Sequence, residues 1–209
     1  MRVTALRVLL AVSLACCCRT AIGQQVQGAA AVVRVPSHGG SAVVIFTEPN
    51  RTLLLTAGHL FSGEARGRRI LLDCPVPAAG APQEVGVRLL RVDSRADLAL
   101  IELRAGPLPF VAPVARQALP GAYSVGYDEL KLPAVVRPVH ELGSRGGWTT
   151  TVERPWHGRS GGALLSADGY LVGIVSAYSG PPDHREVERP WGGIYVSQSA
   201  ILEFLDGGR

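Results

Sequence analysis

The chain has 209 residues and a formal net charge of +4, with 25 glycines and 15 prolines. This length suffices for one substantial domain or for two small halves that share an interface. The glycine and proline content and the absence of long charged heptads argue against a helical bundle and favour many short strands and turns. The lysines and arginines form no large cluster, so we expect no nucleic-acid partner.

Residues 1–23 have the pattern of a signal peptide. Arginines begin this segment, an apolar run spans residues 8–18, and the small residues Ala21 and Gly23 precede the expected cleavage site. We therefore expect export to the periplasm or the extracellular space. The alternative is a lipoprotein signal, in which Cys16 or Cys17 carries the lipid anchor.

The expected cleavage changes the composition of the mature chain. The formal charge falls from +4 to +1, because three arginines are removed with the signal. Three of the four cysteines are removed as well, so Cys74 has no intrachain partner for a disulfide. The mature fold must then depend on core packing and hydrogen bonding alone.

The first half of the chain, residues 24–106, reads as short strands separated by turns. The turn residues Glu48, Pro49 and Asn50 lie between two apolar runs and predict a hairpin. The expected strands are residues 29–35, 41–47, 53–56, 70–72, 85–92 and 98–103. Glycine and proline then interrupt the pattern, so residues 107–120 are the expected linker.

The second half, residues 121–209, repeats this pattern and ends in a helix. The turn Ala167-Asp168-Gly169 predicts a second hairpin. Ser197 is the expected N-cap of a helix over residues 198–205, with apolar residues on one face at Ile201, Leu202 and Leu205. The expected strands are residues 123–125, 135–142, 148–153, 163–166, 170–176 and 194–196.

Four short motifs suggest a chemical function. Residues 55–60 read LTAGHL, residues 97–101 read DLALI, residues 158–163 read GRSGGA and residues 173–176 read GIVS. In this order they resemble the histidine, aspartate, nucleophile and cleft-strand motifs of trypsin-like (chymotrypsin-fold) serine peptidases of the compact exported bacterial type. The resemblance extends over nearly the whole expected mature chain.

The resemblance implies both a fold and an activity. The implied fold is all-β, with two six-stranded antiparallel β-barrels packed together and a short C-terminal helix. The implied activity is that of an endopeptidase acting on polypeptides without metal or organic cofactor. His59 would be the base, Asp97 would orient it, and Ser160 would be the nucleophile. The backbone amides of Gly158 and Ser160 would form the oxyanion hole.

Two neighbouring residues are alternatives for these roles. Asp93 is the nearest rival of Asp97, but the apolar strand starts directly after Asp97. His157 is close to Ser160 in sequence, but the base of the family comes from the first half. We therefore interpret His157 as a loop residue.

The resemblance also suggests where a substrate side chain would bind. Arg154, six residues before the nucleophile, would lie at the base of the pocket and would favour acidic over basic side chains. In the alternative reading the short loop differs in register, and Arg154 faces solvent or pairs with Glu153. The implied walls of the pocket are Ser176, Ala177 and Tyr178 on one side, with Gly192 and Gly193 on the other.

Position 159 departs from the pattern of the cleavage-activated family members. In those enzymes the residue before the nucleophile is acidic, and it pairs with an N-terminal ammonium that cleavage releases. Arg159 cannot form this pair, because two cations repel each other in a poorly solvated site. We expect Arg159 to meet a carboxylate or to face the cleft, and we expect no cleavage beyond signal removal.

The alternative function is that of a binding or scaffolding protein that has the peptidase fold but no turnover. A misformed oxyanion loop would favour this alternative.

Overall fold

The computed structural model describes residues 30–63, 69–74, 83–104, 108, 110–178 and 192–207. For residues 69–74, 83–85 and 178 only the backbone is described. The expected signal peptide lies outside these residues. Within the described part of the chain, no helix is long and apolar enough to cross a membrane.

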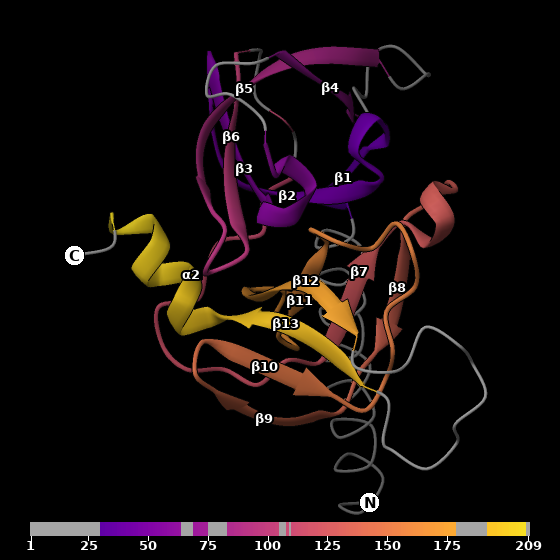
Figure 1. Cartoon of the computed structure of the whole chain (residues 1–209), viewed down its shortest axis with the longest axis vertical. Helices are drawn as coiled ribbons and strands as arrows, with labels where there is room; N and C mark the ends of the chain where they lie inside the picture. Colours follow the sequence, from indigo (N-terminus) through magenta and orange to yellow (C-terminus); the bar gives the residue numbers. More distant parts are fainter. Residues whose placement is uncertain are drawn as a thin grey trace, which may run out of the picture.

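Six strands of the first half close into an antiparallel barrel, shown in the upper part of Figure 1. Their order around the barrel is β1-β2-β3-β6-β5-β4, and closure leaves no unpaired edge strand. The alternating apolar side chains of β2 and β6 fill the interior, where Val44 and Ile101 are buried. The strands are β1 (Val32–Val35), β2 (Gly40–Glu48), β3 (Arg51–Ala57), β4 (Arg69–Cys74), β5 (Gln83–Asp93) and β6 (Leu98–Leu103).

The second half forms a seven-stranded antiparallel sheet of order β8-β7-β11-β12-β13-β10-β9, in the lower part of Figure 1. The prediction of two antiparallel β-units is confirmed, but the second unit has one strand more than expected. The strands are β7 (Tyr123–Gly126), β8 (Val135–Pro138), β9 (Glu141–Arg145), β10 (Trp148–Thr151), β11 (Ala163–Leu165), β12 (Leu171–Tyr178) and β13 (Gly193–Ser197).

The extra strand arises because residues 135–142, expected as one strand, are divided between β8 and β9. Pro138 ends β8, since proline has no N–H to continue a ladder. β8 and β9 lie at opposite edges of the sheet, yet only residues 139 and 140 join them. Such a connection spans at most about 11 Å. The sheet is therefore curled until its two edges nearly meet, which gives it the barrel-like shape of the expected fold.

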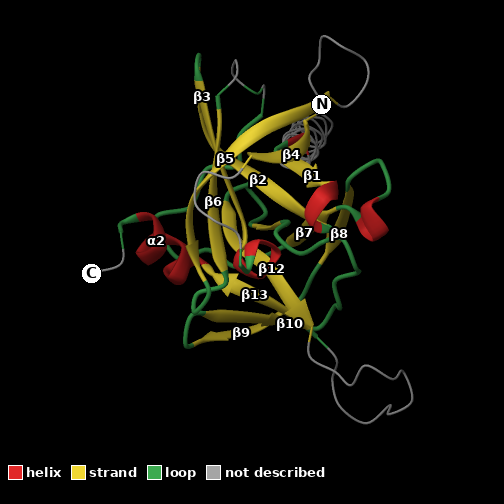
Figure 2. Cartoon of the chain, turned by 45° about the horizontal axis from the view of Figure 1, so that its top comes forward, coloured by secondary structure: helices red, strands yellow, loops and turns green. Residues whose placement is uncertain are grey.

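The C-terminal helix α2 (Gln198–Leu205) has the predicted bounds. The Ser197 hydroxyl accepts a hydrogen bond from the Ala200 N–H at 3.4 Å, as expected of an N-cap. The buried face of α2 is made by Ile201 and Phe204. Leu202, which was expected on that face, is only partly buried. Figure 2 shows α2 beside the junction of the two β-units.

The two β-units share one apolar core. Leu55 and Leu98 of the barrel pack in the same buried cluster as Val125, Ile174 and Val196 of the sheet. Apolar burial contributes roughly 25 cal/mol per Å². The core holds the barrel against the sheet, so residues contributed by the two units can converge at their junction.

Candidate active site

Strand pairing brings His59 and Asp97 together. Ala57, the last residue of β3, lies opposite Leu98, the first residue of β6. His59 follows in the short 3-10 helix η2 (Gly58–Phe61), and Asp97 directly precedes β6. His59 Nδ1 lies 3.1 Å from Asp97 Oδ1 and 3.0 Å from Oδ2, and the His59 backbone N–H donates to Oδ1 at 2.7 Å.

Asp97 is held in place from several sides and is only 9% exposed. Burial raises the pKa of its carboxyl, but hydrogen bonds from His59 and Ser176 outweigh this effect and lower the pKa below the ordinary value of 3.8. Asp97 is therefore ionised at neutral pH. An ionised acceptor at Nδ1 keeps the proton on that nitrogen, which leaves Nε2 of the neutral imidazole as the basic atom.

Asp93, the alternative to Asp97, has a different place. Its Oδ1 accepts hydrogen bonds from the N–H groups of Arg95 at 2.9 Å and Ala96 at 3.0 Å. This is the pattern of an Asx turn, in which a side chain closes its own backbone turn. Asp93 thus shapes the turn between β5 and β6, while Asp97 faces the histidine.

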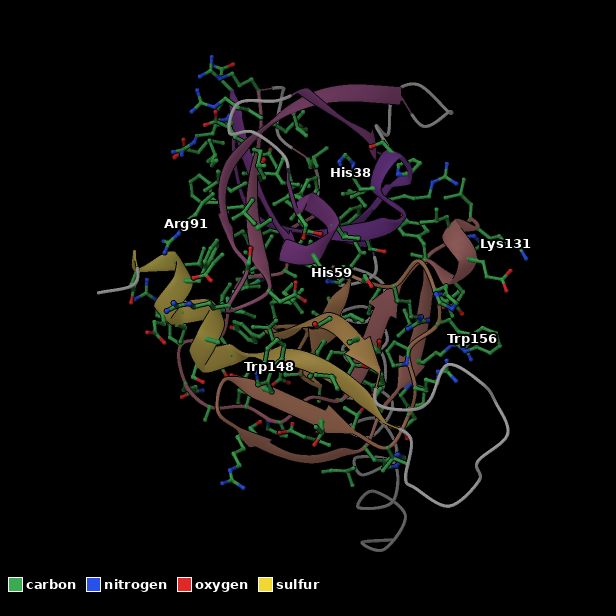
Figure 3. All side chains as sticks on the ribbon, in the orientation of Figure 1. His38, His59, Arg91, Lys131, Trp148 and Trp156 are labelled. Carbon is green, nitrogen blue, oxygen red and sulfur yellow. The ribbon has the colours of Figure 1, made fainter. Side chains whose placement is uncertain are left out.

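Ser160 faces the same cleft as His59. The cleft has a volume of about 310 Å³, and its walls include Leu60, Pro155, Trp156 and Ala177. Figure 3 shows His59 at the junction of the barrel and the sheet. In the described part of the chain, the Ser160 hydroxyl donates to the Ser176 carbonyl oxygen at 3.4 Å rather than to His59. Hydrogen bonds of catalytic groups are often loose without substrate and tighten when it binds.

The loop before Ser160 presents two unused backbone donors. It turns sharply, since the Arg159 N–H donates to the Trp156 carbonyl oxygen at 3.1 Å. Gly158 has a φ of 88°, and a Cβ added there would lie 2.5 Å from the Tyr127 carbonyl oxygen, so only glycine fits. Within the described residues, the N–H groups of Gly158 and Ser160 donate to no protein acceptor.

The family model of the trypsin-like peptidase domain matches residues 40–174, a span that contains His59, Asp97 and Ser160. The chain belongs to the trypsin-like peptidase family. Its fold is similar to that of the serine endoprotease from Yersinia pestis, with a TM-score of 0.66 and 22% identity over 88% of this chain. The match covers 65% of the length of the Yersinia protein. No curated protein sequence matches the chain significantly.

Ser41 of β2 supports this candidate site, and sequence analysis did not identify it. It is fully buried, and its hydroxyl donates to the Gly158 carbonyl oxygen at 2.8 Å and accepts from the Tyr127 N–H at 3.4 Å. The Ser41 N–H also donates to the Ser160 carbonyl oxygen at 2.7 Å. Ser41 thus holds the loop around Ser160 on both sides of residue 159. A serine inside an apolar strand carried no signal for this role in the sequence.

Arg159 points away from the cleft and meets a carboxylate, one of the two expected outcomes. Its side chain is 1% exposed, and its Nε donates to Asp128 Oδ1. Burial raises the pKa of Asp128, but hydrogen bonds from Arg159 and Arg137 outweigh this effect and lower it from the ordinary value of 3.8. Sequence analysis did not identify Asp128, because nothing in the sequence relates it to Arg159, which is 31 positions away.

The lowered pKa of Asp128 predicts how acid affects the peptidase fold. A group with a depressed folded-state pKa stabilises the fold above its unfolded pKa, and this contribution is lost as the pH falls through the folded pKa. The wild type is therefore expected to be more stable than Asp128→Asn at pH 6 to 7, and the difference should shrink below about pH 4. Urea unfolding at several pH values measures this difference. An unchanged difference down to pH 2 would contradict the role of the ionised carboxylate.

The residues expected around the substrate pocket are partly assembled. Ala177 and Ser176 line the cleft, although the Ser176 hydroxyl donates to Asp97 Oδ2 rather than facing a substrate. Gly192 and Gly193 pack closely on Thr151 of the neighbouring β10. The side chain of Tyr178, expected on the same wall as Ser176 and Ala177, lies outside the described residues.

Arg154 is only partly buried and is not among the cleft-lining residues. Glu153, its suggested partner in the alternative reading, has another partner, because its carboxylate accepts from the backbone N–H and the ring of His140. The proposed role of Arg154 at the pocket base therefore stays a prediction. His157, interpreted from the sequence as a loop residue, is exposed at the cleft wall, where its carbonyl oxygen accepts from the Glu129 N–H.

Proposed function

We propose that this chain is a serine endopeptidase that hydrolyses peptide bonds through an acyl-enzyme intermediate. The observation that supports this function best is the buried Asp97 carboxylate paired with His59 Nδ1, beside a cleft that also contains Ser160. In the proposed organisation residues 1–23 direct export, residues 24–106 and 121–209 form the two halves, and residues 107–120 link them. The substrate is a polypeptide chain.

The proposed reaction begins when His59 Nε2 removes the Ser160 proton as Oγ attacks the carbonyl carbon of the scissile bond. Asp97 stabilises the imidazolium that forms, because its carboxylate accepts from Nδ1–H. The imidazolium then protonates the leaving amine, and the acyl group stays on Ser160. Water, activated by His59 in the same way, hydrolyses this ester and regenerates the serine.

Negative charge develops on the carbonyl oxygen in each tetrahedral intermediate. The unused N–H groups of Gly158 and Ser160 are the proposed donors to this oxygen. Removal of one such donor typically costs about 100- to 1000-fold in kcat. The glycines of the nucleophile loop allow the two amides to point the same way.

A fluorophosphonate probe tests the proposed function directly. We expect covalent modification of the wild type at Ser160, identified by mass spectrometry of the modified peptide, and none in Ser160→Ala. His59→Ala should be modified much more slowly, because the serine then lacks its base. Absence of labelling in the folded wild type would reject peptidase chemistry and favour a binding or scaffolding role. One observation is consistent with that alternative: the Ser160 hydroxyl donates to the Ser176 carbonyl oxygen and not to His59 among the described residues.

A further inference from the structure

We propose that Asp128 is a positioning residue that, by pairing with buried Arg159, holds the oxyanion loop in its working shape without any N-terminal cleavage. The inference rests on the proposed peptidase function. The observation that prompts it is a fully buried arginine placed between Gly158 and Ser160, the two residues with unused N–H groups. Contacts that hold the Arg159 side chain therefore also constrain the backbone of the residues before and after it.

Each nitrogen of the Arg159 guanidinium has at least one hydrogen-bond partner. In addition to the bond from Nε to Asp128, Nη1 donates to the Ser124 carbonyl oxygen at 3.2 Å and to Ser124 Oγ at 3.1 Å. Nη2 donates to the Val135 carbonyl oxygen at 3.0 Å. Arginine stays charged in proteins, and a buried charge is costly unless it is paired and hydrogen-bonded. The pairing and hydrogen bonds thus compensate the cost of burying the charge and hold the side chain in place.

The only carboxylate bonded to this guanidinium among the described residues belongs to a turn that itself contacts the loop. Asp128 begins the 3-10 turn η3 (Asp128–Leu130), and the Glu129 N–H donates to the His157 carbonyl oxygen at 2.6 Å. The Leu130 N lies 2.7 Å from the position of a Cβ added to Gly158. The turn thus contacts the loop at His157 and packs on Gly158, and Asp128 fastens it to the loop through Arg159.

The backbone of this turn is strained, which fits a positioning role. Glu129 has a φ of 51° and Leu130 a φ of 61°, in the left-handed region that non-glycine residues rarely adopt. Residues in such regions are strained and persist only where surrounding contacts enforce them. Here the enforcing contacts include Arg34 Nη1, which donates to the Leu130 carbonyl oxygen at 2.7 Å.

The second oxygen of Asp128 extends the arrangement to the cleft wall. Arg137 Nη2 donates to Asp128 Oδ2 at 2.6 Å, and the Arg137 guanidinium carbon lies 5.8 Å from the centroid of the Trp156 ring. Trp156 lines the cleft and supplies the carbonyl oxygen that closes the loop turn. The Asp128 carboxylate therefore binds Arg159, in the middle of the loop, and through Arg137 also reaches Trp156, at the start of the loop. Because both partners are side chains, which are present before any cleavage, the pair forms as the protein folds and needs no newly cut terminus.

The experiment compares Asp128→Ala with the wild type and with Lys131→Gln. Lys131 is a matched control, since its exposed side chain pairs only with Glu129 on the same turn among the described residues. We expect Asp128→Ala to lose about 10- to 1000-fold in kcat with little change in KM, as for a weakened oxyanion hole. Its affinity for a peptide boronic acid, which places a negative oxygen in the hole, should fall with kcat. Lys131→Gln should stay within about twofold of the wild type.

Addition of formate distinguishes positioning from general destabilisation. Asp128 is partly exposed, so a small carboxylate can reach the vacated position beside Arg159. Formate should restore part of the kcat of Asp128→Ala and leave Lys131→Gln unchanged. If Asp128→Ala does not fold, Asp128→Asn serves in its place, because it keeps the shape and loses the charge. Its kcat should fall in the same way.

The outcomes separate this inference from the proposed function. A wild type that is not labelled by the fluorophosphonate probe would reject the peptidase itself. A labelled wild type whose folded Asp128 variants keep full kcat and boronic acid affinity would overturn the positioning role alone. A chain beginning at Gln24 and one with several additional N-terminal residues should be equally active. An extended form that is inactive until trimmed would also overturn the inference.

Discussion

Replacing Ser160 by alanine is expected to lower peptidase turnover by about a millionfold while the fold stays intact, as in other triads. The loss follows because alanine has no oxygen to attack the substrate carbonyl carbon. The fold should be spared because, among the described residues, the Ser160 hydroxyl makes one long hydrogen bond, 3.4 Å to the Ser176 carbonyl oxygen. Peptide-substrate kinetics measure the turnover, and thermal unfolding measures the stability.

Ser62→Ala is the control for this prediction, because Ser62 is exposed just beyond the histidine turn. Its turnover and melting temperature should match those of the wild type. Substantial peptidase activity in purified Ser160→Ala, above the trace expected from a contaminant, would show that another residue is the nucleophile. A collapse of its melting temperature would mean that the hydroxyl is structural instead.

The second large effect is expected for Asp97→Asn, which should lower kcat by about ten-thousandfold. The amide can donate to His59 Nδ1 and so favour the tautomer in which Nε2 carries the proton and cannot act as a base. The substitution also removes the charge that stabilises the imidazolium. Steady-state kinetics with a peptide substrate measure the loss, and KM should change much less than kcat.

Asp93→Asn is the matched control, four residues earlier in the same turn region. An asparagine oxygen can still accept from the N–H groups of Arg95 and Ala96, so the Asx turn is kept. Turnover should stay near that of the wild type. Equal losses in the two variants would indicate that the turn as a whole, rather than the Asp97 carboxylate, supports activity.

Much of the arrangement could be predicted because its signals are local. The strand β6 and the helix α2 have the predicted bounds, since apolar runs and a serine cap define them within a few residues. The positions of His59 and Asp97 follow from motifs attached directly to paired strands. Division of residues 135–142 into two edge strands was not predicted, because it depends on the curvature of the whole sheet rather than on Pro138 alone.

The supporting contacts of the nucleophile loop could not be predicted for a related reason. Ser41 and Tyr127 are separated by 86 positions, and Asp128 and Arg159 by 31. The first pair is determined by how the two β-units pack, and the second by how the η3 turn packs on the loop around Ser160 within the second unit. No local sequence pattern relates the members of either pair. The sequence limited Arg159 to a carboxylate or the cleft, but only the packed structure identifies Asp128 as the carboxylate.

The contacts of Ser41 also bear on how the two β-units depend on each other. Ser41 belongs to the barrel, yet it bonds the carbonyl oxygens of Gly158 and Ser160 in the loop of the other unit. The loop is therefore completed only when both units are docked. A chain divided between Pro113 and Leu119 would behave as a split-enzyme reporter, in which neither fragment hydrolyses peptides and turnover returns on reassociation.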